Sequence, residues 1–246
     1  MADLSHYEGM SWSEFMAWFG RKWKQGEHMA LVAPTGEGKT TTITQLLDLR
    51  KWVMAIDAKG GDTTLAQLLH HGYVRITTWP PPREIREDIE DGRPTKLLVG
   101  LHRPTTSQLP QHKAVIQGAL TEAFDAGGWT VAIDELQMTT DRRMLNLGAM
   151  VERHLILARD RKSSLVTAYQ RPAWVPKSAA QMSTWFMVYY TRDLDAISDL
   201  AHEAGRSPAE LRGAIRALGD IPHAALIFAR NPRIPVIVTR TDIHHA

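Results

Sequence analysis

The sequence predicts an α/β fold in which helices cover both faces of a mainly parallel central sheet. Short apolar segments that suit buried strands alternate with segments whose apolar residues recur at helical spacing. This alternation is typical of parallel sheets, because the crossover between two parallel strands is usually a helix. The last apolar runs, at 225–229 and 236–239, flank Asn231 and Pro232 and predict a closing hairpin. Antiparallel strands are therefore expected near the C-terminus.

The elements can be placed in order along the chain. A capping-box pattern at Ser11 and Glu14 predicts an aromatic-rich helix that ends near residue 25. A second capping box at Ser207, followed by Pro208 at the first helical position, starts a helix near the C-terminus. Between them, strands are expected at 29–32, 52–56, 96–101, 129–133, 164–168 and 185–190, and helices at 41–51, at 111–126, along 144–158 and around Leu65, Leu68 and Leu69.

Composition and length limit the possible classes of protein. With 246 residues, 43% of them hydrophobic, the chain suits one large α/β domain with a sizeable core. We divide this single domain, 1–246, into an N-terminal aromatic helix (1–25), a core (26–191) and C-terminal helices with a hairpin (192–246). The sequence contains neither a membrane-span pattern nor a secretory signal, so a soluble, cytoplasmic protein is expected. The absence of cysteine excludes disulfides and thiolate zinc sites, and His244 and His245 are interpreted as a polar tail.

A phosphate-binding motif occupies residues 33–40, which read Ala-Pro-Thr-Gly-Glu-Gly-Lys-Thr. Ala33 stands where the motif normally has its first glycine, and an alanine there requires a permissive backbone angle. The context still matches the motif, because the apolar run 29–32 predicts a strand before the loop and 41–51 predicts a helix after it. Strand, loop and helix therefore follow in the order that nucleotide binding requires.

The residue types in this loop suit a triphosphate. Gly36 and Gly38 let the backbone N–H groups approach phosphate oxygens, and the start of the following helix points at the same anion. Lys39 can reach the β- and γ-phosphates, and the hydroxyl of Thr40 can ligate Mg²⁺. The predicted ATP-binding residues are Pro34, Thr35, Gly36, Glu37, Gly38, Lys39, Thr40 and Thr41.

An acidic pair, Asp134 and Glu135, follows the apolar strand at 129–133. Open α/β sheets place their ligands at the carboxyl ends of strands, so both carboxylates are expected at the nucleotide. Asp134 would hold the magnesium shell with Thr40, and Glu135 would orient and deprotonate the attacking water. Together with the phosphate loop, the pair predicts a RecA/ASCE-like P-loop NTPase that hydrolyses ATP. We also expect the helix at 11–25 to lie beside the nucleotide, with its tryptophans in the core.

Four segments, taken together, resemble the FtsK/HerA superfamily of DNA-pumping ATPases. They are Gly-Glu-Gly-Lys-Thr at 36–40, Ile-Asp-Ala-Lys-Gly at 56–60, Val-Ala-Ile-Asp-Glu at 131–135 and Gln-Arg-Pro at 170–172. The second and fourth segments discriminate this superfamily from the many other P-loop NTPases. The likeness runs from about Gly26 to Arg171, and within the superfamily the chain is similar to the genome-packaging ATPases of double-stranded DNA viruses and phages.

The resemblance implies a homo-oligomeric ring with ATP between neighbouring subunits and double-stranded DNA in the central channel. The implied function is packaging of a genome into a capsid through a portal vertex, in the host cytoplasm. It also implies that Gln170 is a polar sensor of the γ-phosphate. Three alternatives stay open: a conjugation or chromosome-type DNA pump, an ATP-dependent assembly or secretion factor that does not bind DNA, and a small-molecule kinase, which would need a lid and a second-substrate pocket.

Basic residues gather between 142 and 177, where eight Lys or Arg accompany two acidic residues. Such a segment can meet the phosphates of a neighbour's nucleotide or of DNA. A cationic finger from the adjacent subunit would stabilise the charge that develops during hydrolysis. We select Arg161 for this catalytic role, with Arg159 and Arg153 as alternatives, and we assign DNA contact to Arg142 and Arg143.

Overall fold

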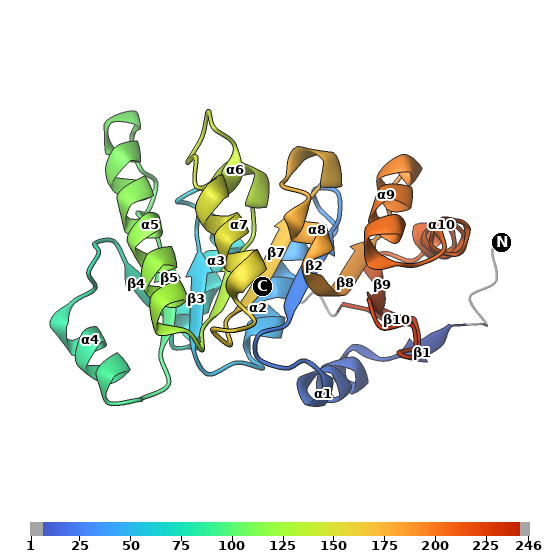
Figure 1. Cartoon of the computed structure of the whole chain (residues 1–246), viewed down its shortest axis with the longest axis horizontal. Helices are drawn as coiled ribbons and strands as arrows, with labels where there is room; N and C mark the ends of the chain where they lie inside the picture. Colours follow the sequence, from blue (N-terminus) through green and yellow to red (C-terminus); the bar gives the residue numbers. More distant parts are fainter. Residues whose placement is uncertain (1–6, 242–246) are drawn as a thin grey trace.

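The computed structural model describes residues 7–241, so the predicted polar tail at His244 and His245 lies outside the described residues. The described residues form one ten-stranded sheet with the order β1-β10-β9-β8-β2-β7-β6-β3-β5-β4 (Figure 1). The strands are β1 (Glu8–Met10), β2 (His28–Val32), β3 (Val53–Ile56), β4 (Val74–Ile76), β5 (Lys96–Val99), β6 (Thr130–Ile133), β7 (Ser164–Tyr169), β8 (Ser183–Tyr189), β9 (Ala224–Ala229) and β10 (Ile237–Arg240).

The pairing confirms the predicted mixture of directions. Seven neighbouring strands, from β8 to β4 in the sheet order, all pair in parallel. The C-terminal strands add antiparallel pairs, because β9 runs against both β8 and β10. Since the seven parallel strands share one direction, all of their carboxyl ends meet at one edge of the sheet.

Helices cover both faces of this sheet (Figure 1). The α-helices are α1 (Trp12–Lys22), α2 (Lys39–Leu47), α3 (Thr63–Ala66), α4 (Arg83–Glu90), α5 (Leu109–Ala126), α6 (Leu136–Thr140), α7 (Gly148–Leu157), α8 (Ser178–Gln181), α9 (Leu194–Ala204) and α10 (Pro208–Ala217). Short 3-10 helices add η1 (Gln67–His71), η2 (Thr106–Gln108), η3 (Pro172–Trp174) and η4 (Leu218–Asp220). No helix within residues 7–241 has the length and apolar character needed to cross a membrane.

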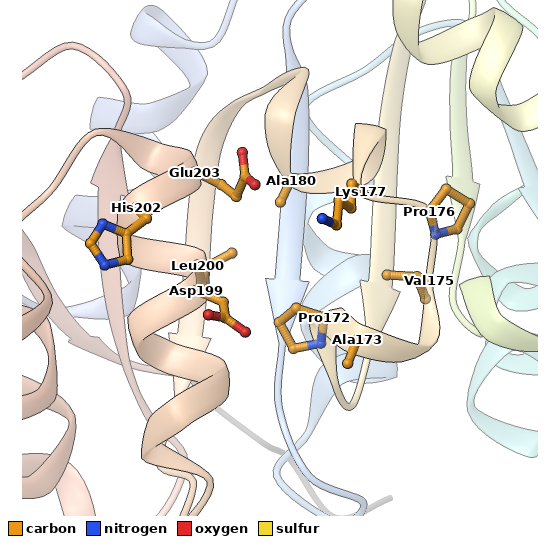
Figure 2. A pocket seen from close by; sticks show the side chains of 10 residues that line it. All are labelled: Pro172, Ala173, Val175, Pro176, Lys177, Ala180, Asp199, Leu200, His202 and Glu203. Atoms are coloured by element: carbon orange, nitrogen blue, oxygen red, sulfur yellow. The ribbon is translucent and has the colours of Figure 1, made fainter.

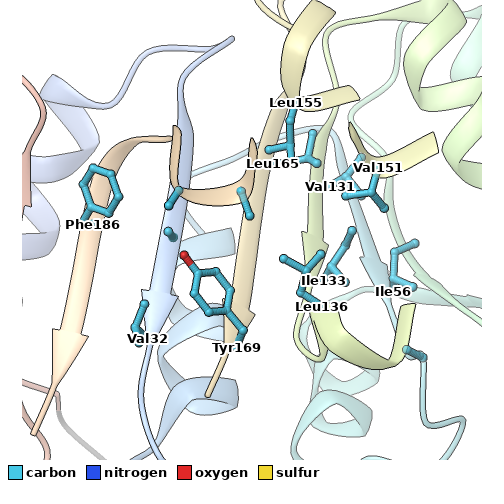
Figure 3. Close-up of a cluster of buried hydrophobic side chains, with 14 of the residues drawn as sticks. Val32, Ile56, Val131, Ile133, Leu136, Val151, Leu155, Leu165, Tyr169 and Phe186 are labelled. Carbon is cyan, nitrogen blue, oxygen red and sulfur yellow. The ribbon is translucent and has the colours of Figure 1, made fainter. Parts of the chain in front are cut away.

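Two hydrophobic cores lie on opposite faces of the sheet. Successive side chains of a strand point to opposite faces, and in β2 Val32 joins the core beneath α5, α7, α9 and α10, whereas Leu31 joins the core beneath α1 and α2. Figure 3 shows part of the first core, where Val151 and Leu155 of α7 pack over Leu165 and its neighbours. Because both faces are covered, the central strands are apolar throughout rather than alternating.

The N-terminal helix is where predicted, but its position corrects one expectation. Ser11 caps α1 through a capping box with Glu14, and the aromatic side chains are in the core as expected. However, Trp18 packs edge-on against Trp185 at the start of β8, and Trp23 packs against Arg50 beyond the end of α2. These contacts lie at the edge away from the phosphate loop, so α1 does not flank the nucleotide site.

The helix expected along 144–158 begins later than predicted, because a turn separates α7 from the short helix α6. After α6 the chain turns at Asp141, whose carboxylate accepts a hydrogen bond from the N–H of Arg143 at 2.7 Å. Asn146 then adopts a positive φ of 52°, and α7 begins only at Gly148. A side chain that satisfies nearby backbone N–H groups favours a turn over a continuous helix, which explains the break.

Candidate active site

The phosphate loop follows β2 at the shared carboxyl edge. Gly36 and Gly38 have φ values of 91° and 90°, a region that residues with a Cβ rarely adopt. Gly38 also caps the start of α2. Ala33 is fully buried and its φ is not positive. Alanine is therefore tolerated at the first motif position, because this loop requires left-handed backbone only at the two later glycines.

Lys39, the first residue of α2, is held inside the loop. Its Nζ donates to the carbonyl oxygens of Ala33 at 2.8 Å and Pro34 at 2.9 Å. Burial lowers the pKa of Lys39, while the charges of Asp134 and Glu135 oppose that shift. Carbonyl oxygens thus stabilise the ammonium group at the place where phosphate oxygens would compete for it.

The predicted magnesium ligands meet directly. The hydroxyl of Thr40 donates to Oδ2 of Asp134 at 2.9 Å. Burial raises the pKa of Asp134 to about 6, against the opposing effect of the Thr40 hydrogen bond. The other carboxylate oxygen, Oδ1, is buried and has no hydrogen-bond partner among residues 7–241. Because Mg²⁺ prefers oxygen ligands and retains bound waters, an unpartnered buried carboxylate oxygen beside a hydroxyl fits this ion.

Glu135 is held by a residue that received no role from the sequence. Its Oε2 lies 2.9 Å from Nζ of Lys59, which comes from the loop after β3. The side chain of Glu135 is 15% exposed and that of Lys59 is 46% exposed. Burial disfavours the charged form of Lys59, but the hydrogen bond and charge of Glu135 outweigh burial, so the pKa of Lys59 is raised.

One cavity of about 330 Å³ brings the predicted residues together. Its wall contains Thr35, Gly36, Gly38, Lys39, Thr40, Thr41, Lys59, Asp62, Thr64, Asp134, Glu135, Gln170 and His223. Among the predicted ATP-binding residues, Pro34 and Glu37 are not on this wall, and their backbone carbonyls accept contacts from Lys39 and His223 instead. Gln170 reaches the cavity from the end of β7, as the resemblance implies.

His223 is a wall residue that sequence reasoning missed. It precedes β9, has a φ of 58°, and its Nδ1 lies 3.4 Å from the carbonyl oxygen of Glu37. No motif surrounds it, and its position depends on the way β9 returns to pair with β8. A sequence signal for this contact is therefore lacking.

The basic residues between 142 and 177 do not form one surface. Arg142 and Arg143 are exposed in the turn after α6, near the carboxyl edge that holds the cavity. Arg161 is exposed before β7, at the opposite edge of the sheet, where its Nη1 donates to the carbonyl oxygen of Asp125 at 3.3 Å. Arg153 stacks over Phe124 from α7, 4.4 Å from the ring centroid. Arg161 therefore lies away from the nucleotide cavity of its own subunit.

A second cavity, of about 380 Å³, lies between the segment after Gln170 and helix α9 (Figure 2). Pro172 and Val175 line one side, and Leu200 of α9 lines the other. Charged residues of both signs also line it, including Lys177 and Glu203. It shares no wall residue with the nucleotide cavity.

Comparison with solved structures places this architecture among known ATPases. The genome packaging NTPase B204 from Sulfolobus turreted icosahedral virus 2, in complex with AMPPCP, matches with a TM-score of 0.60 at 14% identity, over 89% of this chain and 100% of that chain. The pCW3 conjugation coupling protein TcpA, with ATPgS, matches with a TM-score of 0.54 at 13% identity, over 87% of this chain and 59% of that chain. The cytoplasmic domain of the type VII secretion ATPase EccC from Thermomonospora curvata matches with a TM-score of 0.54 at 12% identity, over 89% of this chain and 25% of that chain. No family model and no curated protein matches the chain.

In its fold the chain resembles these P-loop ATPases, which confirms the predicted resemblance at the level of the fold. Within that group the chain resembles a viral genome-packaging ATPase over the whole length of the latter. At these identities the likeness establishes architecture, and function has to be argued from the residues of the site.

Proposed function

We propose that this protein is an ATP-hydrolysing motor that forms a homo-oligomeric ring and moves double-stranded DNA into a viral or phage capsid. The single observation that carries the ATPase assignment is the shared cavity in which Lys39, Thr40, Asp134, Glu135 and Gln170 meet. Each residue type matches one requirement of phosphoryl transfer to water: charge neutralisation, metal ligation, activation of water and detection of the γ-phosphate.

ATP would bind through the amides of residues 36–40 and the ammonium of Lys39. Thr40 and Asp134 would hold Mg²⁺, which when bound neutralises charge on the phosphates. Glu135 would accept a proton from the attacking water as a general base. Gln170, at the end of the neighbouring strand, would respond to the presence of the γ-phosphate.

The acidic residue that follows Asp134 favours hydrolysis over transfer to a second substrate. A kinase needs an acceptor beside the γ-phosphate, whereas Glu135 supplies a base for water there. Release of inorganic phosphate without any acceptor would separate the two activities.

A ring arrangement would place an arginine of one subunit at the ATP of the next. Arg161 is exposed and remains our choice for this trans-acting arginine, with Arg159 and Arg153 as alternatives. Arg142 and Arg143, in the turn that follows α6, are proposed to grip the phosphate backbone, which allows any sequence to be moved. Their position near Glu135 would couple hydrolysis to that grip.

The packaging role is supported by the match with B204 over that protein's whole length. The likenesses to TcpA and EccC support two alternatives, a conjugation-type DNA pump and a secretion factor that does not bind DNA. We place the packaging motor in the host cytoplasm, at a capsid or portal vertex.

Stimulation by DNA tests the proposal. We expect the ATPase rate of the assembled protein to rise with double-stranded DNA and the stimulation to weaken as salt is raised, because phosphate contacts release counterions. The Arg142→Ala, Arg143→Ala double variant should keep its basal rate and lose most of the stimulation. If the ATPase rate of the assembled wild-type protein does not change when DNA is added, this result would contradict translocation and favour the secretion-factor alternative.

A further inference from the structure

The loop after β3, residues 57–62, is anchored so that the side chain of Lys59 lines the nucleotide cavity, where Asp62 also lies. Asp57 is fully buried, and its Oδ1 accepts a hydrogen bond from the N–H of Gly60 at 2.9 Å. Its Oδ2 pairs with Nη1 of Arg75, from β4, at 3.1 Å. Asp62 closes the loop by capping α3, accepting from the N–H groups of Thr64 and Leu65.

Gly60 fixes the turn. Its φ is 71°, and a Cβ at this position would come within 2.8 Å of the carbonyl oxygen of Leu101. The N–H of Arg103 donates to its carbonyl oxygen, which ties the loop to the segment after β5. Between these anchors Lys59 is the residue whose long side chain enters the cavity, and this side chain remains 46% exposed.

Lys59 therefore has two competing partners within reach of one cavity. The first is Glu135, at 2.9 Å. The second would be the phosphate chain of a bound nucleotide, because Lys59 lines the same wall as Thr35, Lys39 and Thr40. A triphosphate carries more negative charge than one carboxylate, and ammonium is a strong phosphate ligand.

We propose that Lys59 is a γ-phosphate-binding residue which pairs with Glu135 before ATP arrives and transfers to the γ-phosphate when ATP binds. The transfer frees the Glu135 carboxylate to accept a proton from water only when a γ-phosphate is present. ADP lacks that group, so it leaves the Lys59–Glu135 pair intact. This inference rests on the proposed ATPase function and adds a lysine to which the sequence assigned no catalytic step.

The test compares the affinities of ADP and of a non-hydrolysable ATP analogue for the assembled full-length protein, measured by calorimetry with Mg²⁺. Lys59→Met should weaken binding of the analogue by about tenfold, the usual effect of losing a charge-assisted hydrogen bond, and leave ADP affinity unchanged. Unchanged ADP affinity also shows that the variant is folded. Lys59→Arg should keep most of the preference for the analogue, and Lys51→Met, at an exposed lysine beyond α2, should match wild type.

A double-mutant cycle tests the exchange of partners. Glu135→Gln removes the carboxylate that pairs with Lys59 before ATP binds. This variant should therefore bind the analogue more tightly than wild type. The increase in affinity should be smaller when Lys59→Met is also present. Equal gains with and without Lys59, or equal effects of Lys59→Met on ADP and the analogue, would overturn the inference while leaving the ATPase assignment intact. A wild type that binds neither nucleotide would overturn both.

Discussion

Thr40 and Asp134 are 94 residues apart in the sequence, and the hydroxyl of one donates to the carboxylate of the other at 2.9 Å. The contact joins the start of α2 to the end of β6, two strands away from β2 in the sheet. It leaves Oδ1 of Asp134 buried and unpartnered within the described part of the chain. The fold thus places the two side chains that we propose as magnesium ligands in direct contact.

Asp134→Asn should raise the Mg²⁺ concentration that ATP hydrolysis requires. The amide keeps the shape of the side chain but removes the negative charge that attracts the cation, so half-maximal hydrolysis should need at least about tenfold more Mg²⁺. A magnesium titration of ATPase rate measures this, with Asp160→Asn, an exposed carboxylate on the opposite edge, as the matched control. An unchanged magnesium requirement would remove Asp134 from the metal site.

Lys39→Ala should abolish nucleotide binding or turnover. The substitution removes the cation that Ala33 and Pro34 hold at the phosphate position, and no other residue of 33–40 supplies positive charge. Binding of a fluorescent ATP analogue and release of phosphate are the measurements. Lys51→Ala, which changes an exposed lysine, serves as the control, and full activity of Lys39→Ala would contradict the phosphate-loop assignment.

Glu135→Gln should bind ATP and hydrolyse it at least about a hundredfold more slowly, because glutamine cannot accept the proton of the attacking water. Single-turnover hydrolysis separates this effect from product release. Turnover equal to wild type would show that another group activates the water.

The motif residues were predictable because each motif depends on a local sequence pattern. A buried strand followed by glycines or acids can be recognised without knowing its neighbours, so β2, β3, β6 and β7 were found together with Lys39, Glu135 and Gln170. The sheet order was not predictable, since it depends on packing between segments far apart in the chain. Strand β4 has only three residues, too few for a periodic pattern, yet it supplies Arg75 to Asp57.

Helix α4 was not predicted, and α9 was expected only as one of the C-terminal helices in 192–246, without bounds of its own. In α4 most residues are charged, and only Ile85 and Ile89 pack against the core, so its apolar stripe is minimal. The start of α9 is capped by Asp193, whose carboxylate accepts from the N–H of Ala196, but no capping box accompanies it. His223 lies at the site through tertiary contacts that no short motif encodes. Lys59 belongs to the segment 56–60, but its ion pair with Glu135 is a tertiary contact that this segment does not specify.

Arg161→Ala subunits should recover activity when mixed with Glu135→Gln subunits. If the arginine acts across an interface, a mixed ring contains interfaces that pair an intact Glu135 with an intact Arg161. ATPase rate as a function of mixing ratio measures the recovery, and Arg171→Ala mixed with Glu135→Gln provides a comparison. Mixtures no more active than either variant alone would exclude Arg161 as the trans-acting residue and direct attention to Arg159 and Arg153.

Acid should destabilise the fold through two buried histidines. In His28, Nδ1 accepts from the N–H of Leu165 at 2.9 Å, so the ring is neutral and its Nε2 donates to the carbonyl oxygen of Leu155 at 3.1 Å. Burial lowers the pKa of His28 to about 4, although the Leu155 hydrogen bond opposes this shift. Burial lowers the pKa of His154 to about 4 as well, and the nearby His28 and Arg153 add to this shift.

Both histidines therefore stabilise the folded state above pH 6.5, where the rings are neutral in either state. Between pH 6.5 and 4 the unfolded chain binds protons that the folded chain excludes, so the free energy of unfolding should fall by about 1.4 kcal/mol per pH unit for each histidine. Urea unfolding at a series of pH values measures this slope. Within the described residues neither ring nitrogen of His154 has a hydrogen-bond partner, so His154→Phe, which places an apolar ring beside Phe124, should reduce the slope by about 1.4 kcal/mol per pH unit. A slope identical to that of wild type would show that His154 does not titrate differently in the folded and unfolded states.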